Sequence, residues 1–175
     1  MPKVIENLRE KLLEEARRQI EERGFGRTTI RSVARACGVA AGTVYNYFPS
    51  KEMLVATFMI RDWRALTDGI ARRDPADRRA CVRAVYDALT SFSEKYKNLF
   101  ADGDAVRAFS AVFTARHAQL REELAALLLP ICPPGDEDER AFLASFTAEA
   151  LLTWTTAQIP FDQLYAVLDK TLKDK

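Results

Sequence analysis

The sequence predicts an all-α protein of about nine helices, and three observations support this prediction. Apolar residues recur at steps of three and four along most of the 175 residues, which is typical of amphipathic helices. No stretch alternates apolar and polar residues over a convincing strand length. Glycine and proline residues divide the chain into segments of helical length. With 48% apolar and 29% charged residues, the chain can bury a hydrophobic core.

The N-terminal part predicts one long helix followed by two short ones. Apolar residues within 4–20 mark one face of the long helix, which Gly24 ends. Thr29 is placed to cap a helix of about two turns, which Gly38 closes. Another short helix follows and ends before Pro49. Because helices of two turns are unstable in isolation, we expect both to pack on the long helix.

Five further helical segments are expected in the rest of the chain. The first begins after Ser50, whose side chain offers a cap, and ends before Pro75. The others are expected over residues 76–97, 106–128, 136–158 and 161–173, with the clearest loop at residues 130–135. A break within residues 106–128, near His117, stays open at this point.

The formal net charge of +1 hides an uneven distribution of charged residues. Residues 1–24 hold as many acidic as basic side chains. Residues 25–51 carry an excess of +4 because they contain no acid, and residues 52–175 therefore sum to −3. The basic side chains of the middle segment are Arg27, Arg31, Arg35 and Lys51. Any nucleic-acid interface is therefore expected in the two short helices.

The cysteine, histidine and hydropathy patterns argue against several other classes of protein. Cys37, Cys81 and Cys132 are widely spaced and odd in number, unlike a disulfide framework. With His117 as the single histidine, no zinc site is expected, and no other metal or cofactor is indicated. The N-terminus lacks the apolar stretch of a signal sequence, and no segment is apolar over the length of a membrane span. We therefore expect a cytoplasmic protein with no membrane partner.

A tight turn between two short helices, supported by a preceding long helix, is the geometry that places a recognition helix in the major groove of DNA. The segment TTIRSVARACGVAAGTVYNYFPSKE, residues 28–52, resembles the DNA-binding signature of the tetracycline-repressor (TetR-type) family of transcriptional regulators. The resemblance extends over residues 3–58, a third of the chain. It implies a homodimeric repressor that binds a pseudo-palindromic double-stranded DNA operator and is released by a small-molecule effector.

The resemblance also implies roles for single residues. Thr29 would cap the first short helix and touch a phosphate, Arg31 would reach a base or the backbone, and Lys51 would bind phosphate beside free N–H groups. The groove-facing positions correspond to Ala41, Gly42, Thr43 and Asn46, and the aromatic pair whose hydroxyls grip the DNA backbone corresponds to Tyr45 and Tyr47. One departure is Ala40, because serine is common there in the family and alanine offers no oxygen to cap the helix.

The rest of the chain shows no motif beyond its helical layout. We divide the sequence into a DNA-binding domain, residues 1–51, and a helical effector-binding and dimerisation domain, residues 52–175. Effector cavities combine aromatic walls with a few polar groups, and the candidates are Met59, Trp63, Tyr86, Phe109, Phe113, His117 and Trp154. Dimer contacts are expected on the last two helices, at Phe142, Phe146, Leu151, Phe161, Leu164, Tyr165 and Leu168.

Each of these interpretations has an alternative. The aromatic effector candidates could be ordinary core residues, and the last two helices could only cap the core of a monomer. The whole chain could be a helical ligand-binding or protein-interaction module with a vestigial DNA-binding face. An enzyme is the least favoured class, because general acid–base catalysis usually needs a positioned pair of groups and the sequence offers no such pair and no nucleophile motif.

Overall fold

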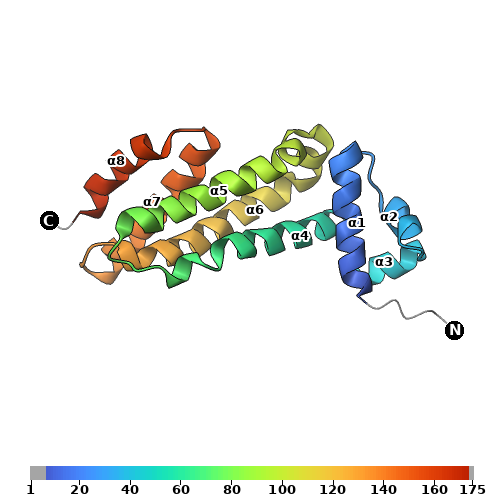
Figure 1. Ribbon diagram of the computed structural model, residues 1–175, viewed down its shortest axis with the longest axis horizontal. Coiled ribbons are helices and arrows are strands. Elements are labelled where there is room, and N and C mark those ends of the chain that lie inside the picture. Colours follow the sequence, from blue (N-terminus) through green and yellow to red (C-terminus); the bar gives the residue numbers. More distant parts are fainter. Residues whose placement is uncertain (1–6, 174–175) are drawn as a thin grey trace. The chain divides into compact units, whose positions relative to one another are not determined.

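The computed structural model describes the backbone of residues 7–173 and the side chains of residues 7–109 and 117–173. Within these residues the protein consists of helices and has no strand, which confirms the predicted all-α fold class (Figure 1). The α-helices are α1 (Leu8–Arg23), α2 (Ile30–Ala36), α3 (Ala41–Tyr47), α4 (Lys51–Thr67), α5 (Arg78–Ala101), α6 (Gly103–Leu128), α7 (Glu137–Thr156) and α8 (Phe161–Leu172). Two 3₁₀ helices, η1 (Ile70–Arg72) and η2 (Leu129–Ile131), lie between them.

The chain divides into two compact units. The first comprises Met1–Asp62 and Tyr96–Ser110, and the second comprises Trp63–Lys95 and Ala111–Lys175. The helices α4, α5 and α6 contribute residues to both units. The first unit therefore contains the predicted helix-turn-helix together with parts of three later helices.

Within the first unit, α2 packs on α1 and α3 packs on α2, as expected for helices of seven residues. Gly24 ends α1 with φ +85°, and Gly38 adopts φ +68° in the turn between α2 and α3. These left-handed values favour glycine because it has no Cβ. The apolar side chains that α1, α2 and α3 bury are Leu8, Leu12, Leu13, Ala16, Ile30, Val33, Ala34 and Val44.

A polar cluster centred on Asp62 joins three helices of the first unit. The guanidinium of Arg17, on α1, donates to both carboxylate oxygens of Asp62, on α4, at 2.9 Å each. The hydroxyl of Tyr96, on α5, donates to Asp62 Oδ2 at 2.6 Å. The Phe58 ring lies beneath the Arg17 guanidinium at 4.9 Å and stacks on the Tyr96 ring at 6.2 Å between centroids. The charged groups are thus paired with one another and covered by an aromatic ring.

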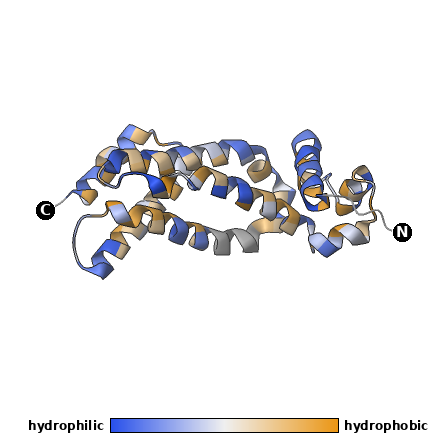
Figure 2. Ribbon diagram, turned by 60° about the horizontal axis from the view of Figure 1, so that its bottom comes forward, coloured by the Kyte–Doolittle hydropathy of each residue, from blue (hydrophilic) through white to orange (hydrophobic). Residues whose placement is uncertain are grey.

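The second unit has an extended apolar core. Figure 2 shows hydrophobic and hydrophilic residues alternating along the helices, as expected for amphipathic helices that bury one face. The α7 helix packs against α8. The most deeply buried apolar residues of this core are Val82, Val85, Leu124, Leu128, Ile131, Ala144, Ala148, Leu151, Leu168 and Leu172.

The structure gives helix bounds at two places that the sequence left open. The α6 helix runs without interruption from Gly103 to Leu128, through the position of His117, because no glycine or proline lies inside it. The α4 helix ends at Thr67, well before Pro75, and is followed by η1. None of the helices in the described part of the chain has the length and apolar character needed to cross a membrane.

Candidate nucleic-acid interface

The short helix α3 has one buried face and one exposed face. Val44 is fully buried and Phe48, which follows the helix, is 2% exposed. Tyr45 and Tyr47 are 51% and 45% exposed, and Asn46 between them is also exposed. Exposed aromatic side chains on a helix that is otherwise held by its core side are available for contacts with a partner. Val44 and Phe48 thus anchor α3 in the core of the first unit, and the tyrosines face away from it.

Most of the other residues predicted to contact DNA also reach the surface of the first unit. Thr29, Arg31 and Gly42 are exposed, whereas Ala41 and Thr43 are partly buried. A Cβ added at Gly42 would meet nothing within 4 Å, so the backbone of α3 is open there. The small residues at the start of α3 therefore leave room for another molecule to approach the helix closely.

The two short helices differ in how they are capped. The hydroxyl oxygen of Thr29 accepts from the backbone N–H of Ser32 at 3.0 Å, and the Thr29 N–H donates to the Ser32 hydroxyl at 3.1 Å. This reciprocal capping box confirms the predicted cap of α2. A hydroxyl can accept and donate at once, so Thr29 can cap α2 and still donate to a phosphate oxygen. Ala40 caps α3 without a side-chain bond, as its lack of an oxygen predicted.

Lys51 is held inside the first unit. Its ammonium donates to the backbone carbonyl of Phe25 at 2.9 Å and lies 3.6 Å from the centroid of the Phe25 ring. Burial lowers the pKa of Lys51 below its ordinary value. The cation is therefore held in place by Phe25, which the sequence did not indicate, and reaches the surface only in part.

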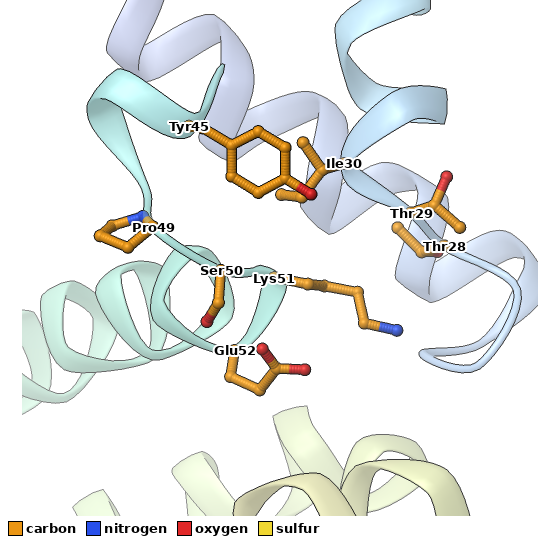
Figure 3. A pocket seen from close by; sticks show the side chains of 8 residues that line it. All are labelled: Thr28, Thr29, Ile30, Tyr45, Pro49, Ser50, Lys51 and Glu52. Carbon is orange, nitrogen blue, oxygen red and sulfur yellow. The ribbon is translucent and has the colours of Figure 1, made fainter. Parts of the chain in front are cut away.

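An open hollow with a volume of about 340 Å³ lies between α2, α3 and the start of α4. Its lining residues are Thr28, Thr29, Ile30, Tyr45, Pro49, Ser50, Lys51 and Glu52. Figure 3 shows the side chains of Tyr45 and Lys51 extending from different helices toward the side where Thr28 and Thr29 lie. We call this site the Tyr45 hollow. It brings four hydroxyl groups and one ammonium, which are groups that bind phosphate, together with the carboxylate of Glu52 around one opening.

The predicted effector residues are divided between the two units. Met59 and Phe109 belong to the first unit, where Phe109 is 3% exposed and its ring lies 5.4 Å from that of Phe25. The side chain of Phe113 lies outside the described residues. Met59 is partly buried.

The other four effector candidates lie in the second unit and have different surroundings. Trp63 is 3% exposed and donates its indole N–H to Glu123 at 3.1 Å. The Tyr86 hydroxyl donates to the backbone carbonyl of Ile159 at 3.0 Å. His117 and Trp154 are exposed. Trp63 and Tyr86 are thus used by the core of the unit, and the other two face outward.

The predicted dimer residues also separate into two groups. Leu151, Phe161, Leu164, Tyr165 and Leu168 are at most 9% exposed and belong to the core of the second unit. Phe142 and Phe146, on α7, are 68% and 45% exposed, and their rings stack at 6.4 Å between centroids. Two further apolar residues of these helices are also exposed, Trp154 on α7 at 50% and Val167 on α8 at 59%. We call these four exposed residues the α7–α8 patch.

Comparison with known proteins gives a family for the N-terminal part of the chain. Residues 12–57 match the family model described as bacterial regulatory proteins, tetR family. The chain is 40% identical over 96 residues to the HTH-type transcriptional regulator BetI of Burkholderia ambifaria, which is 50% of each protein. It is 31% identical over 112 residues to the HTH-type transcriptional repressor KstR2 of Mycolicibacterium smegmatis, which is 64% of this chain and 46% of that protein. The chain thus spans about half the length of these curated relatives.

Solved structures extend the similarity to the whole fold. Thermus thermophilus FadR, a TetR-family repressor solved in complex with lauroyl-CoA, aligns with 95% of this chain and 96% of its own, with 21% identity and a TM-score of 0.58. A TetR-family regulator from Streptomyces coelicolor aligns with 95% of this chain and 94% of its own, with 21% identity and a TM-score of 0.57. These similarities establish the fold, and together with the N-terminal match they confirm the resemblance predicted from the sequence.

Proposed function

We propose that this chain, whose N-terminal part matches the tetR family of bacterial regulatory proteins, is a DNA-binding transcriptional repressor. It binds a pseudo-palindromic operator as a homodimer, with α3 as the recognition helix in the major groove, and a small-molecule effector releases it. The proposed functional division is into residues 1–51, which bind DNA, and residues 52–175, which dimerise and bind the effector. A regulator of this kind acts where the DNA is, so the proposal keeps the cytoplasmic location expected from the sequence.

One observation supports the DNA-binding role most directly. The exposed face of α3 presents Tyr45, Asn46 and Tyr47, and Arg31 of α2 is exposed as well, in a segment that contains no acidic residue between Phe25 and Lys51. Phosphate contacts set the position of a protein on DNA, and polar side chains on the recognition helix read base edges. Residues 25–51 offer cations, hydroxyls and an amide and no carboxylate, which suits both kinds of contact, and the first acid after them is Glu52 at the Tyr45 hollow.

The α7–α8 patch supports the homodimer. Phe142 and Phe146 are four residues apart on one side of α7, and their rings stack on each other. Exposed apolar side chains of this size favour burial at an interface, because leaving them in water is unfavourable. A two-fold axis would place the patch of one protomer against the same patch of its partner. The residues buried in the core of the second unit would support this surface from within.

The effector role is proposed for the helices that follow Lys51. An effector can release DNA only if it has different affinities for two conformations of the protein, since effector and DNA are coupled through that difference. The α4 helix contributes residues to both units, so a change in the conformation of α4 would alter both of them. Lauroyl-CoA is bound by the FadR relative, and the chemical class of the effector of this chain is left open.

The DNA-binding proposal predicts that Arg31→Ala weakens operator binding by about tenfold, because a phosphate or base contact is lost. The probe is a duplex that the unaltered chain selects from a pool of random-sequence duplexes. Affinity measured over a salt series should fall with a log–log slope of about −0.9 per phosphate neutralised, and Arg31→Ala should make that slope shallower if its contact is to phosphate.

Arg72→Ala is the matched control for this experiment. Arg72 is an exposed arginine of η1 in the second unit, so its removal changes the net charge by the same amount away from α2 and α3. We expect this variant to bind the selected duplex like the unaltered chain. An equal loss in both variants would show only a general charge effect. Failure to select any duplex, or a flat salt response, would support the alternative of a helical module with a vestigial DNA-binding face.

A further inference from the structure

The loop between α1 and α2, residues 24–28, is held from several sides. We call it the Phe25 loop. The side chain of Phe25 is 2% exposed and packs on the Phe109 ring of α6 at 5.4 Å between centroids. The Thr28 hydroxyl donates to the Gly24 carbonyl at 3.0 Å, and the Thr28 N–H donates to the Phe25 carbonyl at 3.1 Å. The loop is thus a compact turn that leads directly into the cap of α2.

Both backbone polar groups of Phe25 are bonded to charged side chains from other helices of the same unit. Its N–H donates to Asp102 Oδ2 at 3.1 Å, and its carbonyl accepts from the Lys51 ammonium at 2.9 Å as well as from Thr28. Hydrogen bonds to ionised groups are roughly twice as strong as neutral ones. One residue of the loop therefore connects the start of α6 with the start of α4.

The two carboxylate oxygens of Asp102 accept hydrogen bonds from different parts of the first unit. Oδ1 caps α6 by accepting from the N–H groups of Asp104 at 2.9 Å and Ala105 at 3.1 Å. Oδ2 reaches across to the Phe25 loop. The N–H groups of Ala105 and Asp104, followed by those of Phe25 and Gly26, lower the pKa of Asp102, so the carboxylate is ionised at neutral pH. The cap and the tie to the loop can therefore be separated by mutation.

The glycines of the loop allow this close approach. A Cβ at Gly24 would lie 3.3 Å from Asp102 Oδ2, and one at Gly26 would overlap the carboxylate of Asp104. Gly24 also needs its left-handed φ of +85° to end α1. A side chain at either position would push the loop away from the start of α6. The sequence of the loop thus fits the contact with Asp102.

We propose that Asp102 is a positioning residue for DNA binding, which fixes the Phe25 loop and, through Phe25, the Lys51 ammonium at the Tyr45 hollow. This role rests on the function proposed above. Thr28, Thr29 and Lys51 all line the hollow; Thr28 is the last residue of the loop, and Thr29 directly follows it. DNA binding requires several phosphate contacts at the same time, so groups already held in place bind with less loss of conformational entropy.

A second effect of Asp102 has the opposite sign, and this makes the proposal testable. The negative charges of Glu52, Asp102 and Asp104 all favour the protonated form of Lys51, which places the three carboxylates near the ammonium. Negative charges near a phosphate site repel the phosphates of DNA and so oppose its binding. Removing a carboxylate should therefore strengthen binding if charge alone matters, and weaken it if the tie to Phe25 matters more.

The experiment compares Asp102→Asn with Asp104→Asn. In Asp102→Asn the amide oxygen can still cap α6, because asparagine caps helices as well as aspartate does. Its NH₂ group would face the Phe25 N–H, so the tie is lost while the cap survives. Asp104→Asn removes the same charge two residues further along, from a side chain that pairs with Arg107 and makes no bond to the Phe25 backbone in the described residues. The probe is the duplex selected by the unaltered chain.

We expect Asp102→Asn to bind the duplex roughly tenfold more weakly and Asp104→Asn to bind it equally or more tightly. Affinities are compared at a temperature where thermal denaturation shows both variants to be folded. Equal or tighter binding by Asp102→Asn would overturn the proposal. A lower melting temperature with unchanged affinity would also overturn it, because the role would then be only structural.

Amide hydrogen exchange tests the tie without DNA. The Phe25 amide should exchange at least about tenfold faster in Asp102→Asn than in the unaltered chain. In Asp104→Asn its exchange rate should equal that of the unaltered chain. Unaltered exchange in Asp102→Asn would overturn the tie whatever the DNA result. If the unaltered chain selects no duplex, both the proposed function and the positioning role fail. If the unaltered chain selects a duplex and Asp102→Asn binds it equally well, only the role of Asp102 fails.

Discussion

A shared carboxylate shows at the scale of single residues how α1, α4 and α5 are joined. Asp62 accepts from the Arg17 guanidinium and from the Tyr96 hydroxyl, and Tyr96 is 6% exposed. A buried charge is tolerated only when it is paired and hydrogen-bonded, and here the carboxylate has both kinds of partner. The Tyr96 hydroxyl is thus a donor to a charged acceptor in a site with little water.

This arrangement predicts that Tyr96→Phe lowers the free energy of unfolding by about 1.5–2 kcal/mol, because a hydrogen bond to a charged group is lost. Tyr86→Phe is the control, since the Tyr86 hydroxyl donates to a neutral carbonyl, that of Ile159. Tyr86→Phe should lower the free energy of unfolding by less, about 1 kcal/mol at most. Urea denaturation of both variants measures the difference, and equal losses would contradict the special contribution of Asp62.

The same residue predicts a dependence on pH. Burial and the bond to Asp62 raise the pKa of Tyr96 above its ordinary value. The phenol of the unfolded chain ionises near pH 10, so the stability that Tyr96 contributes is complete below about pH 10 and is lost as the pH rises further. The difference between the unaltered chain and Tyr96→Phe should therefore shrink above about pH 10. A difference that stays constant would contradict this.

Single residues were predictable from the sequence where the local pattern decides their position. The inward position of Phe48 and the cap at Thr29 follow from helical spacing and from the preference for threonine at helix starts. The bonds of Lys51 and Asp102 to Phe25 were not predictable, because they join residues 26 and 77 positions apart. No local pattern reports which backbone group a distant side chain will meet.

At the scale of elements, α3 is a helix without a side-chain cap. Ala40 has φ −71° and ψ 148°, the extended conformation that capping residues adopt, yet it offers no oxygen to the first N–H groups of the helix. A seven-residue helix leaves a large share of its N–H groups without partners inside the helix. The stability of α3 therefore depends on its packing against α2.

Ala40→Ser should stabilise the protein by about 1 kcal/mol, because the serine oxygen can accept from an N–H of the first turn of α3. The control is Ala41→Ser, which adds the same hydroxyl one position later, inside the helix, where serine is less favourable than alanine. The midpoint of urea denaturation should rise for the first variant and stay equal or fall for the second. Similar rises in both would argue against a capping effect.

The existence of the helices was more predictable than their bounds and their exposed faces. Periodicity and turn residues predicted all eight α-helices of the described part, including the short α2 and α3. The α4 helix ends at Thr67, two residues before Gly69, so this end follows a glycine signal rather than the more distant Pro75. The last two helices carry apolar residues on more than one side, so the sequence could not separate Leu151, which is buried, from Phe146, which is exposed.

At the scale of the whole molecule, the excess of positive charge and the exposed apolar residues of α7 and α8 lie in different parts of the sequence. The basic excess of residues 25–51 contrasts with the net negative charge of residues 52–175. DNA attracts the first segment and repels the second wherever it approaches, which favours binding through α2 and α3. The α7–α8 patch lies in the negative segment, so the proposed dimer surface and the proposed DNA surface use different chemistry.

The homodimer predicts that Phe142→Glu weakens self-association by on the order of 100-fold or more, because a carboxylate would be buried in an apolar interface. A two-fold dimer contains each substitution twice, which increases the effect. Phe142 is 68% exposed in the single chain, so its replacement should leave the core of the second unit intact. Analytical ultracentrifugation over a concentration series measures the dimer, and thermal denaturation checks the fold.

Leu129→Glu is the control for this prediction, because Leu129 is 37% exposed on η2 and lies outside the α7–α8 patch. It should remain as dimeric as the unaltered chain. Phe142→Glu should also bind the selected duplex more weakly, since two half-sites are held by one dimer and independently bound protomers lose that advantage. A variant that stays dimeric would place the interface on another surface. A monomeric variant with full operator affinity would show that one protomer suffices for DNA binding, and the pseudo-palindromic operator would then have to be abandoned.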